Sequence, residues 1–571
     1  MRKTIKKTVA TVLALGMGLS LMPMTACKKG SANDESTCEV KAVIAGYATD
    51  WLVEAADVFN DMYEDEGYSV EISLMDTDVG MAMEMTTPKR NTTDLYFEWT
   101  GSIDNLIEKS RSILGADGGA LLEDLSDVLS SSAINKNKQS VGGAIEERID
   151  PTHVDLSRYK GSFSGFDGVY GMPWYGGTAG IYVNKKVLAE KGYTFDAFLT
   201  TDSMIEMTEA LAPKGDARLN RNSFFPVTWT GMSSGYWDYW IQSLIAQYMG
   251  FDTYKDFWDF IPAGGEEAMI ESGYTVYENR GIYEALKVAE TLENRDYAVP
   301  GTAGMNHIEA QARLFEGSSL YMVTGDWVYK EMELNYGDKL DDVIAVKNPV
   351  VSALGVKLGL CGTTHEEPAF DTDNFVADYS CAACETKLRA IIKAVDANAK
   401  TDAQIASDVG VTEEQVATVR ERRGYYQANT GFSAMIPSYS NAKDVAKLFL
   451  RFLCSDDGID IYTKNTYSNF IVERITPIDS STLSDREKAV YDMMYTGKTT
   501  PFFTKSNNPI RVVTSSSVFP AAGTTKLAYL NLSYSHIDTK NPVYTAKSTF
   551  FDNVLIAKGN WADWVATAGL N

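Results

Sequence analysis

Two large aromatic residues, Trp174 and Tyr175, stand directly before two glycines in the stretch MPWYGGTAGIYVNKK, residues 172–186. An indole or phenol ring on a loop offers a flat apolar surface, and carboxylates beside it can accept hydrogen bonds from a ligand. Gly176 and Gly177 let such a loop bend and let a ligand approach its backbone. The pattern predicts a binding surface, unless the two rings pack beneath the loop against the rest of the protein.

Further aromatic residues and acids stand where predicted strands end or where a strand turns into a helix. Loops at such positions often carry the side chains that meet a ligand. Asp50 could instead cap the helix that follows it, and Trp240, three residues after Trp237, is expected in the core. The complete set of candidates is Asp50, Glu98, Trp99, Trp174, Tyr175, Trp229, Trp237, Asp326, Trp327 and Phe432.

Few motifs for catalysis or cofactor binding are found in the sequence. There is no H-E-x-x-H pair, and the four histidines are scattered. One stretch, GMSSG at 231–235, fits the pattern G-x-S-x-G, but a five-residue match alone does not identify a hydrolase. The run 497–499 ends like a phosphate loop, but Asp492 stands where that loop needs its first glycine and would repel phosphate. We therefore expect no catalytic residue, no cofactor and no metal ligand. A glycoside hydrolase requires two carboxylates that face each other. Nothing among the 77 acidic residues singles out such a pair, and nothing excludes one, so this alternative stays open.

Five cysteines follow Cys27, and an odd number cannot pair completely within one chain. They are Cys38, Cys361, Cys381, Cys384 and Cys454. Cys381 and Cys384 form a single C-x-x-C without a second such pair and without a histidine close by in the sequence. Buried thiols or one local disulfide are expected there, and a zinc or redox site stays open.

Patterns of apolar residues predict the elements that position these side chains. Residues 40–45, 68–76 and 94–99 are predicted strands, and 50–63 is a predicted helix with one apolar face. This order indicates a layered α/β lobe. Later segments predict a strand and short helix over 180–192, a strand at 319–327, an amphipathic helix with Val445, Leu448, Phe449 and Phe452 inward and Gly458 at its end, and a last helix that docks through Trp561 and Trp564.

The length of 571 residues is too great for one hydrophobic core, so we expect an α/β protein of two lobes. The first lobe is assigned to 39–165 and 430–475, and the second to 166–365 and 476–571. Residues 366–429 have the character of a helical insertion, with Gly410 in the turn of a helix-turn-helix spacing. A net charge of −25 argues against nucleic-acid binding, which needs patches of Lys and Arg. The insertion is therefore expected to be a structural addition.

The N-terminus has the features of an export signal. Four basic residues between 2 and 7 precede an apolar stretch, 9–22, that is too short to span a bilayer comfortably. The following MTAC resembles the bacterial lipobox, with Met24 where leucine is commoner. We expect cleavage of 1–26, lipidation of Cys27 and a flexible tether over 27–38. The alternative is an ordinary signal peptide that is followed by a cysteine by chance. The protein would then lie on the outer face of a bacterial cell membrane, held by its lipid anchor alone.

Several segments, in their order along the chain, resemble the carbohydrate-type (family 1) extracellular solute-binding lipoproteins of bacterial ABC importers. Besides the lipobox-like N-terminus, they are YGMPWYGGTAGIYVNKKVLAEKGY (170–193), RLFEGSSLYMVTGDWVYKEM (313–332) and GFSAMIPSYSNAKDVAKLFLRFLCSDDGIDIY (431–462). The resemblance extends over most of residues 38–475. The insertion and the long C-terminal tail depart from the shortest members of that family.

The resemblance implies two α/β lobes joined by hinge strands, a ligand cleft between them, closure over a sugar, and delivery to a membrane permease with its ATPase. A sugar has an apolar C–H face and a hydroxyl-rich rim, so Trp174 and Tyr175 would stack on the face while acids bond the rim. The sequence thus predicts non-catalytic capture of an oligosaccharide, and replacing Trp174 with alanine should weaken it by about 1–3 kcal/mol. A surface glycoside hydrolase, and a sensor or binder of another solute with the same fold, remain the alternatives.

Overall fold

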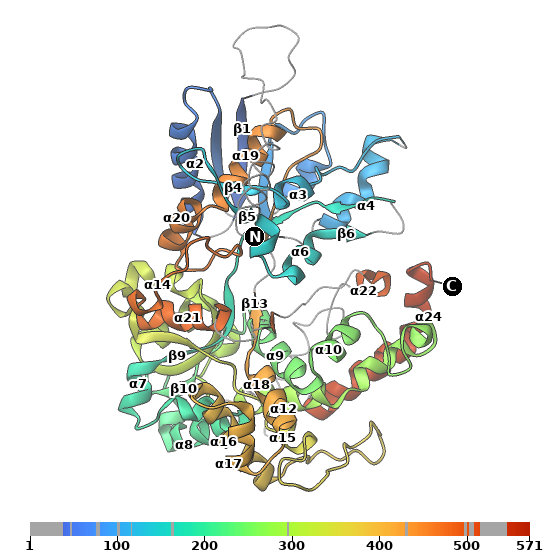
Figure 1. The fold of residues 1–571 in the computed structure, drawn as a ribbon. Helices are drawn as coiled ribbons and strands as arrows, with labels where there is room; N and C mark the ends of the chain where they lie inside the picture. The colour runs from blue at the N-terminus through green and yellow to red at the C-terminus, as the bar shows by residue number, and fades with distance from the viewer. Residues whose placement is uncertain are drawn as a thin grey trace, which may run out of the picture.

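The computed structural model describes residues 38–45, 48–75, 80–99, 103–115, 117–160, 165–293, 296–428, 432–495, 500–501, 508–513 and 545–570. The expected signal peptide, the lipidation site Cys27, nearly all of the tether and the phosphate-loop-like run 497–499 lie outside these residues. The chain forms two lobes, each built on its own β-sheet (Figure 1). Among the helices in the described ranges, none combines the length and the apolar character needed to cross a membrane.

The first lobe is built on a five-stranded sheet in the order β2-β1-β3-β14-β8. β1 (Glu39–Ala45) pairs in parallel with β2 (Ser69–Met75) and β3 (Leu95–Trp99). β14 (Phe432–Met435) runs antiparallel to β3 and to β8 (Met172–Pro173). The helix α2 (Asp50–Met62) joins β1 to β2 and buries the apolar face that includes Trp51 and Phe59. The three predicted strands and the predicted helix are confirmed to within one residue at each end.

Two consecutive helices of the first lobe follow β14 in the chain. α19 (Lys443–Leu453) buries the predicted apolar face, but it ends at Leu453 and not at Gly458. Ser455 caps the next helix, α20 (Asp456–Thr466), by accepting a hydrogen bond from the backbone N–H of Gly458, so this glycine lies within a first turn. The remaining elements are α3 (Met81–Met85), α4 (Ile103–Leu114), α5 (Ser126–Leu129), β4 (Ser132–Ile134), β5 (Ser140–Ala144), η2 (Ile145–Arg148), α6 (Pro151–Ser157), β6 (Arg158–Lys160) and β7 (Asp167–Val169).

The second lobe is built on a sheet in the order β10-β11-β9-β13-β15, with β12 also paired to β9. The central strand β9 (Thr178–Asn184) is buried along its whole length and runs antiparallel to β11, β12 and β13. A strand that is covered on both faces reads as a continuous apolar run, which is how it was recognised in the sequence. The other strands are β10 (Phe225–Val227), β11 (Ser319–Gly325), β12 (Val343–Val346), β13 (Tyr425–Ala428) and β15 (Thr500–Pro501).

Helices surround this second sheet (Figure 1). The α-helices are α7 (Lys185–Glu190), α8 (Thr201–Leu211), α9 (Asp238–Met249), α10 (Phe251–Trp258), α11 (Met269–Ser272), α12 (Arg280–Leu292), α13 (His307–Glu316), α14 (Val328–Tyr336), α15 (Ala353–Lys357), α21 (Asp485–Tyr495) and α22 (Pro509–Val513). The 3-10 turns are η3 (Phe195–Phe198), η4 (Gly215–Leu219), η5 (Ser234–Trp237), η6 (Glu266–Ala268), η7 (Gly273–Glu278), η8 (Thr302–Gly304), η9 (Gly337–Asp342) and η10 (Ser480–Thr482).

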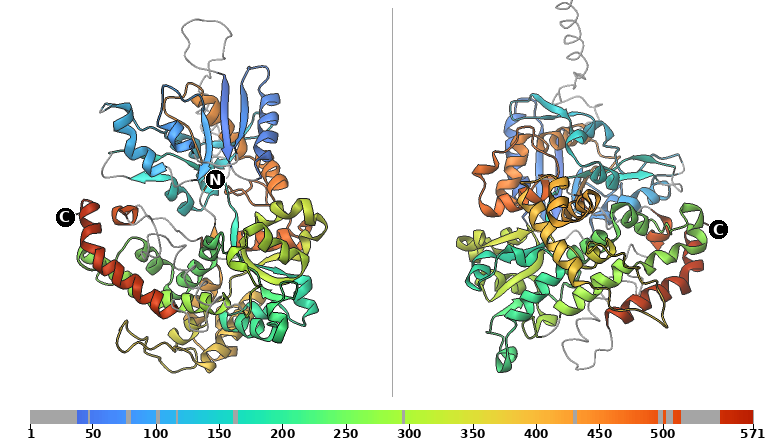
Figure 2. Two further views of the ribbon diagram at one scale, coloured as in Figure 1. Left: turned by 180° about the vertical axis from the view of Figure 1, so that it is seen from behind. Right: turned by 60° about the horizontal axis from the view of Figure 1, so that its bottom comes forward.

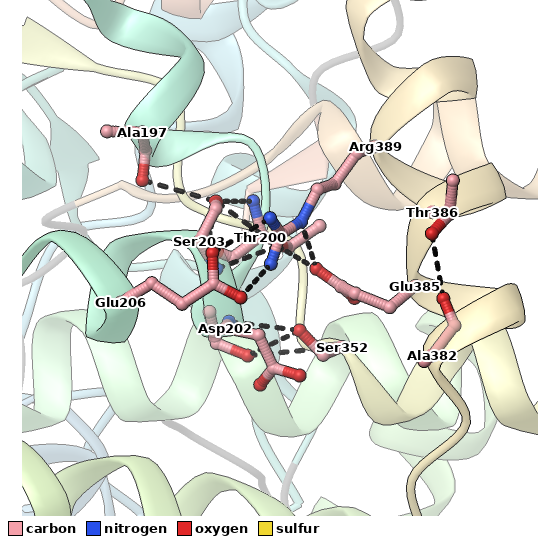
Figure 3. Close-up of polar contacts among 11 residues, drawn as sticks. Ala197, Thr200, Asp202, Ser203, Glu206, Ser352, Ala382, Glu385, Thr386 and Arg389 are labelled. Atoms are coloured by element: carbon pink, nitrogen blue, oxygen red, sulfur yellow. Dashed lines mark hydrogen bonds and ion pairs between the residues drawn. The ribbon is translucent and has the colours of Figure 1, made fainter. Parts of the chain in front are cut away.

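The helical insertion consists of α16 (Ala382–Ala397), α17 (Asp402–Val409) and α18 (Glu413–Arg423). Gly410 ends α17 with a φ of +72°, the left-handed conformation that favours glycine. Figure 3 shows how α16 is fastened to α8: the guanidinium of Arg389 contacts both Glu206 and Glu385. Beside this contact, Ser352 accepts a hydrogen bond from the backbone N–H of Asp202, in the first turn of α8, at 3.0 Å. The insertion is thus packed onto the second lobe.

The last helix, α24 (Ala546–Thr567), lies along the second lobe, as the left view of Figure 2 shows. Trp561 is buried and donates from its indole nitrogen to the carbonyl oxygen of Ile270 at 2.8 Å. Trp564 is only partly buried and contacts the Trp561 ring at 6.3 Å between centroids. The predicted docking of this helix is confirmed, and Trp561 is the more deeply buried of the two tryptophans.

The chain crosses between the lobes at residues 174–177, which join β8 of the first sheet to β9 of the second. This crossing lies after β7 and β8, further along the chain than the boundary at 165 expected from sequence. A second segment, 469–471, pairs with it in antiparallel fashion. Gly176 N donates to Asn469 O at 3.0 Å, and Ile471 N donates to Trp174 O at 3.1 Å. Trp174 and Tyr175 therefore lie on a connection between the lobes.

We expect Gly176→Ala to destabilise this crossing. An added Cβ would lie 2.9 Å from the carbonyl carbon and oxygen of Phe470, and backbone paired to the crossing cannot move aside freely. Overpacking of this kind costs about 1–3 kcal/mol. Gly337→Ala is a matched control, because nothing lies within 4 Å of its Cβ and its φ is −53°. Chemical denaturation of both variants checks this, and equal free energies of unfolding would contradict the close approach.

Candidate functional site

Seven rings gather where the first lobe meets the crossing segments, and we name them the aromatic junction: Trp51, Phe97, Trp174, Tyr175, Phe432, Tyr462 and Phe470. They come from α2, β3, β14, α20 and the two paired crossings. The Trp174 ring lies at its centre, with centroid distances of 5.5 Å to Trp51 and 5.3 Å to Phe432. The junction therefore joins the packing of the first lobe to the connection between the lobes.

Trp174 and Tyr175 are more buried than the sequence suggested. Their exposed fractions are 6% and 7%, and both belong to the hydrophobic core of the first lobe. Of the two interpretations open at the start, packing against the lobe describes the structure better than exposure on a loop. The glycines that follow admit a close approach, but the group approaching Gly176 is the backbone of residues 469 and 470.

Tyr175 links the crossing to the second lobe through Asp326. Its hydroxyl donates to Asp326 Oδ1 at 2.7 Å, and the backbone N–H of Thr178 donates to Oδ2 at 3.2 Å. Asp326 follows β11 and is fully buried. Burial raises the pKa of Asp326 to about 6, and the bonds from Tyr175 and Thr178 oppose that rise. Asp326 is thus a buried carboxylate beside the crossing, with polar partners already on both oxygens.

A second group, which we name the tyrosine rim, lies on the second lobe: Tyr236, Tyr239, His307, Trp327 and Glu331. Trp327 donates from its indole nitrogen to the Tyr236 hydroxyl at 3.2 Å, and the Tyr239 ring lies 5.2 Å from the Trp327 ring. Trp327 is buried, whereas Tyr236 and Tyr239 are half-buried. Tyr239 packs against the hydrophobic cores of both lobes, so the rim lies at their boundary.

The rim carries a second perturbed carboxylate. Burial raises the pKa of Glu331 to about 7, although Gln311 donates to its Oε2 at 2.7 Å. The imidazole of His307 lies 3.6 Å from the other oxygen of Glu331 and stacks on the Tyr236 ring. Burial lowers the pKa of His307. Rings and acids thus occur together at the rim, the combination that binds a ligand with an apolar face and a polar edge.

Sequence reasoning did not select Tyr236, Tyr239, His307 or Glu331. In the stretch SGYWDYW, 234–240, a tryptophan was selected from the sequence and neither tyrosine was. Trp229 and Trp237, expected as platforms, are each only 2% exposed and lie in the core of the second lobe with Trp240. Where η5 passes into α9, the tryptophans turn inward and the two tyrosines face the boundary. The alternation of Tyr and Trp in this stretch was the one available signal.

The remaining sequence candidates occupy different positions. Phe432 is half-buried in the aromatic junction and contacts the Tyr175 ring at 5.1 Å. Glu98 is buried on β3, where its backbone pairs with Ser433, and the backbone of Trp99 pairs with Phe432. Asp50 is exposed as the first residue of α2, and the N-cap residue is Thr49, so Asp50 does not cap this helix. An acid in a first helical turn is nevertheless favourable to the helix dipole.

A separate cavity of about 330 Å³ lies in the second lobe between α8, α12, α15 and α16. Its lining includes the carboxylates of Asp202, Glu206, Glu284 and Glu385, together with Lys287. Burial raises the pKa of Asp202. The cavity shares no residue with the aromatic junction or the tyrosine rim, and it offers no tryptophan among its lining residues. We therefore place the candidate binding site at the boundary of the lobes.

Comparisons with solved structures agree on the fold, although no protein-family model and no curated protein matches the sequence. Among solved structures, a chitin oligosaccharide binding protein is 12% identical, with 92% of this chain and 100% of that chain covered and a TM-score of 0.54. The bacterial solute receptor AcbH, described as having an exclusive preference for β-D-galactopyranose, is 13% identical over 92% and 100%, with a TM-score of 0.54.

A third similar structure is identified by its family. It is a family 1 extracellular solute-binding protein from Bifidobacterium longum subsp. infantis, 14% identical over 91% of this chain and 99% of that one, with a TM-score of 0.50. Identities this low establish shared architecture and do not carry over a ligand. The chain has the two-lobed α/β fold of these extracellular solute-binding proteins.

Proposed function

We propose that the chain is a family 1 solute-binding lipoprotein that captures an oligosaccharide outside the cytoplasm and passes it, unaltered, to an ABC permease and its ATPase. The observation that supports this best is the boundary between the lobes. There, half-buried rings of Tyr236, Tyr239 and Phe432 accompany the buried Asp326 and the half-buried Glu331. The structural similarity to receptors for sugars supports the same class of ligand.

The chemistry of the boundary suits a polyol. Phenol and indole rings stack on the C–H face of a sugar, and carboxylates accept hydrogen bonds from its hydroxyl groups. The indole nitrogen of Trp174 has no hydrogen-bond partner among the described residues, although it is buried. A buried donor without an acceptor costs about 1–3 kcal/mol. A ligand hydroxyl that reaches Trp174 would remove that cost, which would favour binding at the junction.

Capture would proceed by closure of the lobes. The paired crossings at 174–176 and 469–471 form a narrow connection about which the lobes can rotate. A ligand that contacts Phe432 from the first lobe and Tyr239 from the second stabilises the closed arrangement through contacts that the open one lacks. The rings would become accessible when the lobes separate, which explains how residues this buried could serve a ligand. In this proposal Trp327 supports the half-exposed rings of Tyr236 and Tyr239 from beneath.

The transport role adds a location and two partners. Cys27 would carry acyl chains and hold the protein at the outer face of the membrane, within reach of the permease. Because the ligand leaves the site unchanged, the energy for import would come from the partner ATPase. These steps follow the family resemblance in the sequence, and labelling of wild-type and Cys27→Ser cells with a radioactive fatty acid would test the anchor directly.

A thermal-shift screen of the purified chain against mono- and oligosaccharides tests the ligand class, and Tyr239→Ala tests the site. We expect an oligosaccharide to raise the melting temperature, and Tyr239→Ala to weaken its binding by about 1–3 kcal/mol, or roughly tenfold to a hundredfold in Kd. Tyr297→Ala is the matched control: this tyrosine is also half-buried, but its hydroxyl donates to Glu209 away from the lobe boundary. Equal affinities for both variants would remove Tyr239 from the site.

A further inference from the structure

Four side chains with metal-binding atoms converge in the second lobe, away from the proposed sugar site. Cys361 and His365 lie in the segment that follows α15, whereas Cys381 and Cys384 lie at the start of α16. The three sulfur atoms and one ring nitrogen all lie within 4.8 Å of one another. The sequence offered only the isolated C-x-x-C. The fold supplies a second pair, C-x-x-x-H, from about twenty residues earlier in the chain.

We propose that these four residues bind a structural zinc ion. Zinc takes four ligands in a tetrahedron, with Zn–S near 2.3 Å and Zn–N near 2.0–2.1 Å, and Cys₃His is one of its usual structural sets. Those bond lengths require S···N separations of about 3.5 Å and S···S separations of about 3.8 Å. Cys361 Sγ and Cys384 Sγ lie 3.3 Å and 3.6 Å from His365 Nε2. Two of the three sulfur atoms thus already lie at this spacing from the ring nitrogen, and the Cys381 sulfur lies within 4.8 Å of the other three donor atoms.

The donor set favours zinc over other ions and over a disulfide. Calcium and magnesium prefer oxygen ligands, whereas three thiolates and an imidazole suit a softer tetrahedral ion. Cys361, Cys381 and Cys384 are all free thiols in the structure. One disulfide among them would account for only two of the four converging side chains, and the positions of the third sulfur and the imidazole would stay unexplained. A closed set of four protein ligands also leaves no position for a substrate, which assigns the ion a structural role.

The place of the site in the fold explains what the ion would stabilise. Residues 358–381, between α15 and α16, contain neither helix nor strand. A segment of this length inside a compact lobe needs other constraints. The ion would join the segment's two ends, since Cys361 and His365 belong to its beginning, Cys381 is its last residue, and Cys384 lies in the first turn of α16. Ligand binding that occurs only in the folded chain contributes directly to stability.

Between its ends the segment packs on α12 and α24. Phe375 contacts the rings of Tyr283 and Phe551 at 4.7 Å and 5.0 Å. Arg280, on α12, donates to the carbonyl oxygens of Val376 and Ala377 at 2.5 Å and 2.9 Å. The metal site would hold the ends of the segment so that these contacts form together. Loss of the ion should therefore loosen the segment and its packing on α24, and should leave the lobe boundary unchanged.

Metal analysis of the mature chain, purified in detergent without added metal or a metal-binding tag, tests the proposal. We expect about one zinc ion per chain, falling below about one tenth in the Cys381→Ser/Cys384→Ser variant. Cys454→Ala, which removes a buried free thiol of the first lobe, should keep the zinc. A chelator should lower the melting temperature of the wild type and of Cys454→Ala, and should leave the double variant unaffected.

A second pair of variants protects the test against simple misfolding. His365→Cys creates a four-cysteine set, which also binds zinc, and should retain the ion; His365→Ala should lose it or hold it weakly. Cobalt added to the zinc-depleted chain should give the absorption of a tetrahedral thiolate complex. The proposal is overturned if the reduced, folded chain binds neither zinc nor cobalt. It is equally overturned if alkylation at isolation shows a disulfide among Cys361, Cys381 and Cys384.

Discussion

Replacing Trp174 with alanine is expected to lower the free energy of unfolding by about 3–5 kcal/mol, the usual cost of emptying a buried tryptophan site. The indole is 6% exposed and contacts rings from α2, β3, β14 and α20. Its loss would leave a cavity at the centre of the aromatic junction, where the first lobe meets the crossing. The expected loss of stability exceeds the loss in sugar affinity that the sequence alone predicted.

Chemical denaturation followed by circular dichroism measures this effect. Trp564→Ala is the matched control, because that indole is only partly buried at the far end of α24 and should cost much less. If Trp174→Ala left stability within about 1 kcal/mol of the wild type, the ring would not be part of the core. A stable variant that bound sugar poorly would instead restore the interpretation of Trp174 as an exposed platform.

Asp326→Asn is expected to change how stability depends on pH. The pKa of Asp326 rises from 3.8 when the chain is unfolded to about 6 in the buried site, so the folded chain binds this proton more tightly. The resulting stabilisation is complete below about pH 4 and is lost as the pH rises through about 6. A shift of about two pKa units corresponds to about 3 kcal/mol, and burial of Asp326 is complete, so solvent does not reduce it.

Asparagine does not titrate, so the comparison isolates this one group. Relative to Asp326→Asn, the wild type should lose about 3 kcal/mol of stability between about pH 4 and pH 7. Glu331, whose pKa burial also raises, titrates in both proteins and cancels in the difference. Denaturation curves at several pH values provide the measurement. A difference between the two proteins that stays constant with pH would show that Asp326 is not perturbed in the folded chain.

Local patterns were sufficient to predict several elements of this fold. The alternation in β2, the amphipathic face of α2 and the apolar run of β9 each reflect burial along a short stretch, which a sequence records directly. Gly410 was placed in its turn for the same reason, since its positive φ is a local requirement. The error at Gly458 shows the limit, because a Ser cap three residues earlier began another helix there.

The candidate site depended on contacts between distant segments, which a single sequence does not record. Trp237 and Tyr239 stand two residues apart, yet one ring enters the core and the other reaches the lobe boundary. Trp174 was selected for its residue type and loop position, but its burial depends on α20, nearly three hundred residues later. His365 and Cys361 meet the C-x-x-C only because the segment between them folds back. Residue type pointed to Trp174 and Trp237, but the neighbours of all these side chains depend on how distant segments pack.

The most direct test of the account is a calorimetric titration of the mature chain with the oligosaccharides that raise its melting temperature, with the sugar recovered afterwards for chromatography. The account predicts saturable binding of about one sugar per chain and recovery of that sugar intact. Release of new reducing ends would identify a hydrolase instead. Absence of heat and of any thermal shift across the sugar panel, from a chain shown to be folded, would contradict the proposal that this protein captures carbohydrate.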